Sequence, residues 1–128
     1  MSRTIIFSPL APRPIGPYSQ AVVSNGVAYL SGQIAIDPKS GEMSNGDLKA
    51  QAELVMSNLR AVLEAAKSDF SQVIKTSIFL APGEDFSIVN EVYGQYFSDE
   101  FPARETVWVH TLPKNARVEI SMIALVSE

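Results

Sequence analysis

The sequence contains no cysteine and a single histidine, His110. The absence of cysteine excludes disulfides, a catalytic thiolate, and zinc or iron–sulfur centres held by cysteine. One histidine argues against a histidine-rich metal site, and we expect the protein to use neither a metal nor another cofactor. Ten Lys and Arg residues stand against 14 Asp and Glu residues, for a formal net charge of −4. This balance argues against a general nucleic-acid binder, because phosphate contacts need clustered basic residues.

The chain also lacks long apolar runs. No run approaches the roughly 20 residues of a membrane helix, and the segment 1–6 lacks the apolar stretch of a secretion signal. We therefore expect a cytoplasmic protein with no membrane partner. A length of 128 residues suits one domain, here residues 1–128, which can bury roughly two-thirds of its unfolded surface. Its chemistry would rest on carboxylates, arginine, hydroxyls and backbone amides.

Hydrophobic periodicity predicts the secondary structure. The expected strands span residues 5–7, 18–23, 27–36, 73–80, 104–111 and 117–126. Asn25 and Gly26 are typical of a tight hairpin turn. A helical spacing of apolar residues follows Asp47, which can cap it, and a second helix begins after Asp85. The nearly continuous apolar run at 73–80 predicts a strand buried on both faces.

The element order β-β-β-α-β-α-β-β predicts an α+β domain with both helices on one face of the sheet. The other face is also expected to be largely apolar, so we predict a homo-oligomer in which another copy covers it. The five-residue loop between the last two strands predicts an antiparallel pair that aligns residue 109 with Glu119. Arg104 would then lie roughly 17 Å from that position, with its side chain on the opposite side. The two could meet only through a bulge or across a subunit boundary.

Three positions could carry chemistry, and each also has a structural interpretation. Gly32, after Ser31, marks either an approach of a ligand to the backbone or a packing glycine. Arg104 follows Pro102 at the start of a strand, where it suits bidentate capture of a carboxylate or a surface ion pair with a neighbouring acid. Glu119 lies either on a solvated edge or in a pocket. Partial burial there would raise its pKa and let it orient or deprotonate a water.

Four further residues are open to two interpretations. Tyr18 is a strand aromatic or a phenol that binds a ligand, and Asn90 is an exposed amide or part of a site. Trp108 and His110 share a side of their strand with Arg104, and such residues are more typical of packing or of an interface. The sequence has no P-loop, dinucleotide fingerprint or metal-ligand spacing.

These motifs together resemble the RidA/YjgF family of reactive-intermediate deaminases, also called the endoribonuclease L-PSP family. The resemblance runs from about residue 5 to 126. Its motifs are GPYSQA at 16–21, SGQ at 31–33, DPKSG at 37–41, VNEVY at 89–93, FPAR at 101–104, LPK at 112–114 and VEI at 118–120. The resemblance implies a chorismate-mutase-like fold and a homotrimer around a central barrel, with sites in the clefts between subunits.

The resemblance also implies hydrolysis of short 2-imino or enamine acids, such as 2-iminobutanoate and 2-iminopropanoate, to 2-oxo acids and ammonia. Arg104 would bind the substrate carboxylate, and Glu119 would position the attacking water. The residues expected to contact the substrate are Tyr18, Ser31, Gly32, Asn90 and Thr106, the last through its backbone amide. An imine carbon is already electrophilic, so the protein must supply orientation and proton transfer rather than a cofactor.

Two alternatives stay open at this level: a non-catalytic module that binds 2-oxo acids, and a ribonuclease or translation inhibitor, against which the net charge weighs. The chain departs from the family pattern at Glu105, where a small residue is common, although strand alternation turns it away from Arg104. Trp108 and His110 replace smaller or charged residues and are expected to affect trimer packing or substrate preference. Lys67 stands where a glycine often ends the first helix.

Overall fold

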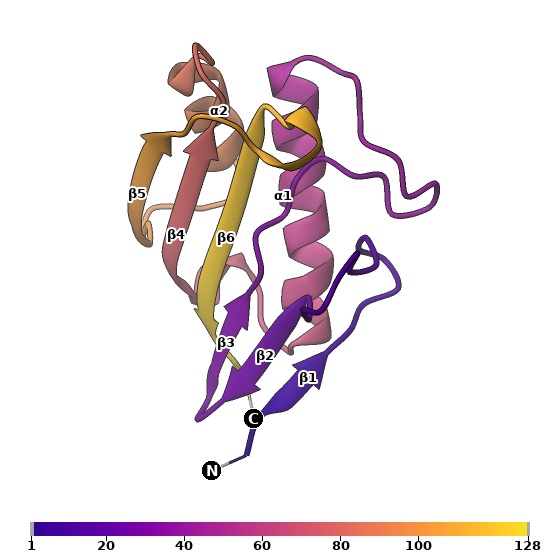
Figure 1. The fold of residues 1–128 in the computed structure, drawn as a ribbon. Helices are drawn as coiled ribbons and strands as arrows, with labels where there is room; N and C mark the ends of the chain where they lie inside the picture. Colours follow the sequence, from indigo (N-terminus) through magenta and orange to yellow (C-terminus); the bar gives the residue numbers. More distant parts are fainter. Residues whose placement is uncertain (1, 128) are drawn as a thin grey trace.

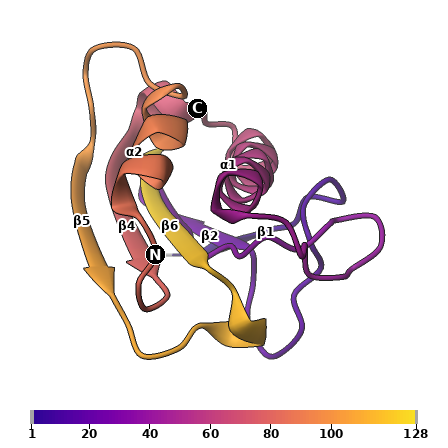
Figure 2. The same ribbon diagram turned by 90° about the horizontal axis from the view of Figure 1, so that it is seen from above.

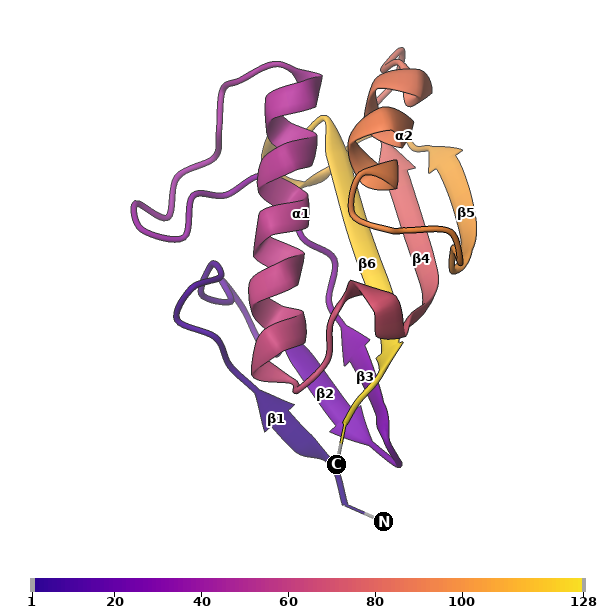
Figure 3. The ribbon, with the colours of Figure 1, turned by 180° about the vertical axis from the view of Figure 1, so that it is seen from behind.

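The computed structural model describes residues 2–127, and its six strands form one mixed sheet in the order β1-β2-β3-β6-β4-β5 (Figure 1). The strands are β1 (Thr4–Ile6), β2 (Ala21–Ser24), β3 (Val27–Leu30), β4 (Val73–Leu80), β5 (Ala103–Trp108) and β6 (Val118–Leu125). The helices are α1 (Leu48–Ala65) and α2 (Phe86–Gly94), with short 3-10 turns at η1 (Phe70–Gln72) and η2 (Pro113–Asn115). The element order confirms the α+β prediction, and both helices lie on one face of the sheet (Figures 2 and 3).

Local sequence signals explain how these elements begin and turn. Asn25 and Gly26 both have positive φ, 53° and 75°, as a tight hairpin turn between β2 and β3 requires. The carboxylates of Asp47 and Asp85 each accept a backbone hydrogen bond of 2.9 Å from the first turn of α1 and α2. The predicted turn and both predicted caps are therefore confirmed. Within residues 2–127 neither helix has the length and apolarity of a membrane span.

The core lies between the helices and the sheet face that they cover. Residues of β6 alternate between buried and partly exposed along the strand, and those of β4 do so from Thr76 onward. In β4, Thr76, Ile78 and Leu80 are buried beneath the helices. The residues between them, Ser77 and Phe79, are only partly buried. The prediction that this strand is buried on both faces is therefore wrong for the single chain, because only one face of the sheet carries helices.

Two strand boundaries differ from the predictions near the candidate glycine. β2 begins at Ala21 rather than at residue 18, and β3 ends at Leu30 rather than at residue 36. Beyond Leu30 the chain makes one isolated bridge to β6, in which the backbones of Gln33 and Ile120 exchange hydrogen bonds of 2.8 and 3.1 Å. Ser31 and Gly32 thus form a short irregular segment between a strand and a bridge.

The predicted hairpin between the last two strands is wrong, because β4 lies between β5 and β6. β5 pairs in parallel with β4, with Arg104 opposite Thr76. β6 pairs antiparallel with β4 on its other edge, with Glu119 opposite Phe79. A parallel pair needs a crossover connection, and α2 supplies it between β4 and β5. The residues between β5 and β6 therefore pass over the end of β4.

The helix-free face of the sheet is partly apolar and partly polar. Ile5, Tyr29, Val107 and Leu125 are among its exposed apolar residues. Between them Lys75 pairs with Glu105, with 3.1 Å from Nζ to Oε1. A polar band therefore crosses the face that we predicted to be largely apolar.

The end of α1 offers a test of stability. Lys67 follows the C-cap residue Ala66 and has a φ of 63°, in the left-handed region where a β carbon is unfavourable. We expect Lys67→Gly to raise the free energy of unfolding by about 0.5–1 kcal/mol in urea denaturation. Ser57→Gly, on the exposed side of the same helix, should instead lower it by about 0.5 kcal/mol. A loss of stability in Lys67→Gly would contradict the argument.

Candidate active site

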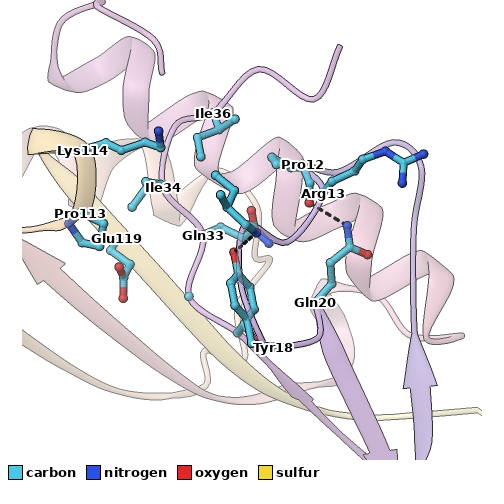
Figure 4. A pocket seen from close by; sticks show the side chains of 13 residues that line it. Pro12, Arg13, Tyr18, Gln20, Gln33, Ile34, Ile36, Pro113, Lys114 and Glu119 are labelled. Atoms are coloured by element: carbon cyan, nitrogen blue, oxygen red, sulfur yellow. Dashed lines mark hydrogen bonds between the residues drawn. The ribbon is translucent and has the colours of Figure 1, made fainter. Parts of the chain in front are cut away.

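A cavity of about 520 Å³ opens at the start of β6 (Figure 4). Of the residues predicted from the sequence, it brings together Glu119, Tyr18, Ser31 and Gly32. Glu119 and the exposed Lys114 lie on one side, and the loop before β2 forms the other (Figure 4). The cavity therefore combines one carboxylate, Glu119, with two basic side chains, Arg13 and Lys114, and with apolar surface.

Gly32 leaves the space that the Glu119 carboxylate occupies. A β carbon at position 32 would lie 2.5 Å from Oε2 of Glu119, closer than real side-chain contacts allow. The bridge between Gln33 and Ile120 aligns the two segments and creates this close approach. Gly32 is thus required for a close approach, but the group that approaches it in the structure is a side chain of the same protein.

The Glu119 carboxyl group is about half buried, and this burial raises its pKa above the ordinary value. Among residues 2–127 no basic side chain forms an ion pair with it. The solvated-edge interpretation is therefore wrong, since the side chain sits in a cavity and is desolvated there. A carboxylate with a raised pKa is better matched to accepting a proton from water near neutral pH.

The wall opposite Glu119 is held in place by Gln20, a residue that the sequence analysis missed. Gln20 is fully buried; its Oε1 accepts from the Ser8 backbone N–H at 2.6 Å, and its Nε2 donates to the Pro12 carbonyl at 2.9 Å. The Ser31 hydroxyl donates to the Ser19 carbonyl at 2.6 Å. These bonds fix the proline-rich loop that carries Tyr18. The sequence signal that could have identified Gln20 is its polar amide at the start of a strand whose inner face is apolar.

Arg104 lies against α2, on the helix side of the sheet. Its guanidinium carbon is 5.2 Å from the Phe86 ring centroid and 5.1 Å from that of Tyr93, and Nη1 donates to Oδ1 of Asn90 at 2.9 Å. Phe86, Asn90 and Tyr93 follow the i, i+4, i+7 spacing of one helix face; we call these three residues the α2 stripe. Arg104 forms no ion pair within residues 2–127, so the surface-pair interpretation is wrong.

The α2 stripe leaves Arg104 able to bind an anion. A guanidinium has five N–H donors, and the bond to Asn90 uses one of them. A second cavity of about 460 Å³ beside the arginine is lined by Asn90, Tyr93 and Phe101 among others. The Tyr93 phenol donates to the Thr76 hydroxyl at 3.0 Å, and burial raises the pKa of this phenol, which therefore stays neutral and fixed.

Three other predicted residues lie on or after β5. Thr106 lies between Arg104 and Trp108 on the same side, but it lines neither of the two cavities. Its hydroxyl is buried and has no hydrogen-bond partner among residues 2–127. Trp108 also faces α2, where its indole donates to the Glu84 carbonyl at 2.9 Å. His110 is exposed beyond the end of the strand.

Glu105 lies on the opposite face from Arg104, as strand alternation predicted. Its carboxylate accepts hydrogen bonds from Ser77 and Lys75 on the helix-free face, and these bonds lower its pKa. Glu105 therefore does not compete with an anion for Arg104.

Arg104 and Glu119 do not meet within one chain. Their partners on β4, Thr76 and Phe79, are three residues apart, which is about 10 Å along the strand. Because three is odd, the two side chains also point to opposite faces of the sheet. The predicted opposite orientation is thus confirmed, although through β4 rather than through a direct pair. Each chain therefore carries two separate clusters of predicted site residues, one with Arg104 and Asn90 and one with Glu119, Tyr18, Ser31 and Gly32. We call these clusters half-sites, because the site predicted from the sequence combines them.

Neither half-site offers a ligand set for a metal ion. Across the described residues no group of three or more His, Cys, Asp or Glu side chains gathers in one place. The Glu119 cavity contributes one carboxylate, with the amide of Gln33 and the amine of Lys114 at its walls. What these groups can do is bind a small anion and transfer a proton.

Comparison with known proteins identifies close relatives. Residues 9–126 match the family described as Endoribonuclease L-PSP. Protein DfrA of Myxococcus xanthus is 54% identical over 127 residues, 98% of this chain and 97% of that protein. The human protein named 2-iminobutanoate/2-iminopropanoate deaminase is 45% identical over 123 residues, 96% of this chain and 90% of that protein. The crystal structure of E. coli TdcF with bound serine superposes with a TM-score of 0.90 and 38% identity, and the match covers 97% of this chain and 99% of that one.

Proposed function

Since this chain belongs to the endoribonuclease L-PSP family, the RidA/YjgF family, we propose that it hydrolyses short 2-imino acids to 2-oxo acids and ammonia. The substrates would be 2-iminobutanoate, 2-iminopropanoate and their enamine tautomers. Relatives named for this deaminase activity, from human, cattle and goat, are 45–46% identical over nearly the whole chain. The observation that carries the proposal is the pair of half-sites. In one, Arg104 lies beside a cavity and only one of its N–H donors is used by Asn90. In the other, burial raises the pKa of the Glu119 carboxyl, which favours uptake of a proton.

In the proposed reaction Arg104 binds the substrate carboxylate and so places the imine carbon. With the imine nitrogen protonated, Glu119 takes a proton from a water as its oxygen adds to that carbon, which gives a tetrahedral carbinolamine. Glu119 then returns this proton to the nitrogen and takes up the proton of the new hydroxyl as the C–N bond breaks, so that ammonia leaves and the C=O bond of the 2-oxo acid forms. The reaction consumes one water and needs no oxidant.

The active unit is proposed to be a homotrimer in which Arg104 of one copy faces Glu119 of the next. The two half-sites on one chain point to opposite faces, so a complete site needs a second copy. The exposed Tyr29, Val107 and Leu125 on the helix-free face supply apolar surface for such contacts. Light scattering should give three times the chain mass of 13.9 kDa. A monomer in solution would contradict the shared site.

The reaction itself can be tested with 2-iminobutanoate generated in place by a threonine dehydratase. We expect the purified protein to speed the release of 2-oxobutanoate and ammonia above the rate in buffer. No acceleration by a correctly assembled trimer would overturn the proposal. Binding of 2-oxobutanoate without turnover would instead identify a non-catalytic module.

Gly32→Ala tests the placement of the carboxylate. The new β carbon would clash with Oε2 of Glu119, and because a flexible side chain can move away, we expect little loss of stability. The displaced carboxylate should lower kcat by about tenfold or more. Gly16→Ala is the matched control, because its β carbon would lie 3.8 Å from the Tyr18 ring, an ordinary contact. Equal activity in both variants would show that the position of the Glu119 side chain does not matter.

A further inference from the structure

Trp108 is the one tryptophan of the chain. It lines neither half-site, but it contacts Phe86, one of the residues that pack against Arg104. The Trp108 residue is 52% exposed, yet its indole N–H donates to the Glu84 carbonyl at 2.9 Å. Its ring meets the Phe86 ring edge-on, with centroids 6.4 Å apart. Phe86 in turn lies 5.2 Å from the Arg104 guanidinium. A continuous line of contacts therefore runs from Trp108 through Phe86 to Arg104.

These contacts act at the beginning of α2. Phe86 is the first residue of the helix, where the helix is most prone to fray. Asp85 caps this end. The carbonyl of Glu84, the residue before Asp85, accepts the hydrogen bond from the Trp108 indole. The Glu84 carboxylate also pairs with Arg117, which precedes β6, at 3.4 Å. The loop before α2 is thus fastened to the end of β5 and to the residue that precedes β6.

We infer that Trp108 is a positioning residue for Arg104, holding the Glu84 carbonyl and the Phe86 ring so that the N-terminal end of the α2 stripe stays beneath the guanidinium. This role rests on the proposed function, in which Arg104 binds the substrate carboxylate. A ring stacked on a guanidinium leaves its N–H edge directed outward in the plane. Without Trp108 the Phe86 ring is free to turn, and the arginine must be ordered anew each time a ligand binds.

The expected signature is a change in binding rather than in chemistry. Because Trp108 does not touch the reacting atoms, its loss should raise KM and the Kd for 2-oxobutanoate while kcat at saturation is kept. A residue that only stabilises the fold would lower the melting temperature and the active fraction, with KM and Kd unchanged. The split between KM and kcat therefore separates the two roles.

The test is calorimetric titration of the trimer with 2-oxobutanoate. We expect Trp108→Ala and Phe86→Leu each to raise the Kd by about tenfold, and the double variant to raise it no further, because both break the same line of contacts. Trp108→Phe keeps an aromatic ring but loses the bond to Glu84, so its Kd should rise by less. Ile88→Ala, an exposed residue of the same helix, is the control and should bind as the wild type does.

Each outcome bears on the inference. An unchanged Kd in Trp108→Ala and Trp108→Phe overturns the positioning role and leaves the proposed function standing. Independent, multiplied losses in the double variant overturn it as well. If Trp108→Ala does not fold, the cycle is closed with Trp108→Phe and Phe86→Leu, and the same criterion holds. A wild-type trimer that neither binds 2-oxobutanoate nor hydrolyses the imine overturns the proposed function, and the positioning role with it.

Discussion

Arg104→Ala is expected to lower kcat/KM for 2-iminobutanoate by about 100- to 1,000-fold, because it removes the group that we propose binds the substrate carboxylate. The guanidinium is held by two aromatic rings and by Asn90. Binding in the wild type therefore has only a small entropic cost from ordering this side chain. Arg104→Lys should recover only part of the loss, since an ammonium lacks the planar fork that matches a carboxylate. Steady-state kinetics with the imine generated in place, together with calorimetry of 2-oxobutanoate, measures both effects.

Arg60 provides a matched control for this variant. Its guanidinium also lies between two rings, at 5.5 Å from Phe70 and 5.1 Å from Tyr96, but it lines neither half-site. Arg60→Ala should lose packing energy and keep kcat/KM, whereas Arg104→Ala should lose kcat/KM. Equal kinetics in the two variants would show that Arg104 is only a structural arginine.

Glu119→Gln is expected to lower kcat by about 10²- to 10⁴-fold, because the amide keeps the shape of the side chain but cannot accept the proton from water.

The Glu119→Gln variant should stay folded. Burial raises the pKa of Glu119 in the folded chain, so the stabilising contribution of this group is fully present below its unfolded pKa. That contribution is lost as the pH rises through the folded pKa. At neutral pH the charged Glu119 side chain is destabilised by desolvation, whereas the uncharged glutamine side chain is not. Urea denaturation of the variant should therefore show no loss of stability.

The same shift predicts the pH dependence of the wild type. The proposed reaction needs Glu119 deprotonated, so kcat should fall as the pH drops through its raised pKa, and this acid limb should lie above the ordinary range of a glutamate. The limb should be absent from the residual activity of Glu119→Gln. Glu53→Gln, on the exposed side of α1, should keep it. A limb at the ordinary glutamate value in the wild type would argue against a desolvated base.

Mixing the two inactive variants tests whether the site is shared. In the proposed trimer, reassembled from equal amounts of Arg104→Ala and Glu119→Gln chains, about one quarter of the clefts would receive both wild-type groups, since the arginine would come from one copy and the glutamate from the next. Activity near one quarter of the wild type is therefore expected after mixing. Activity that stays at the level of the separate variants would place both groups in one chain.

Local signals in the sequence were sufficient for the elements. The turn at Asn25 and Gly26, the caps Asp47 and Asp85, and the alternation that separates Arg104 from Glu105 all depend on neighbouring residues, and the structure has each as predicted. β3 ends earlier than predicted, before Gly32, because the residues after Leu30 leave the ladder for an irregular segment. That departure depends on a bridge to β6, far away in the sequence.

The sequence by itself determined the element order, the absence of thiol chemistry, and the residue types available for a site, because composition and periodicity are properties of the chain alone. Only the tertiary structure decided that β4 lies between β5 and β6, since strand order depends on which distant segments pack together. It also decided that Phe86 and Tyr93 hold Arg104, that Gly32 makes room for Glu119, and that burial raises the pKa of this carboxyl. Each of these is a contact or a loss of solvent between residues far apart in sequence, and local propensity carries no information about either.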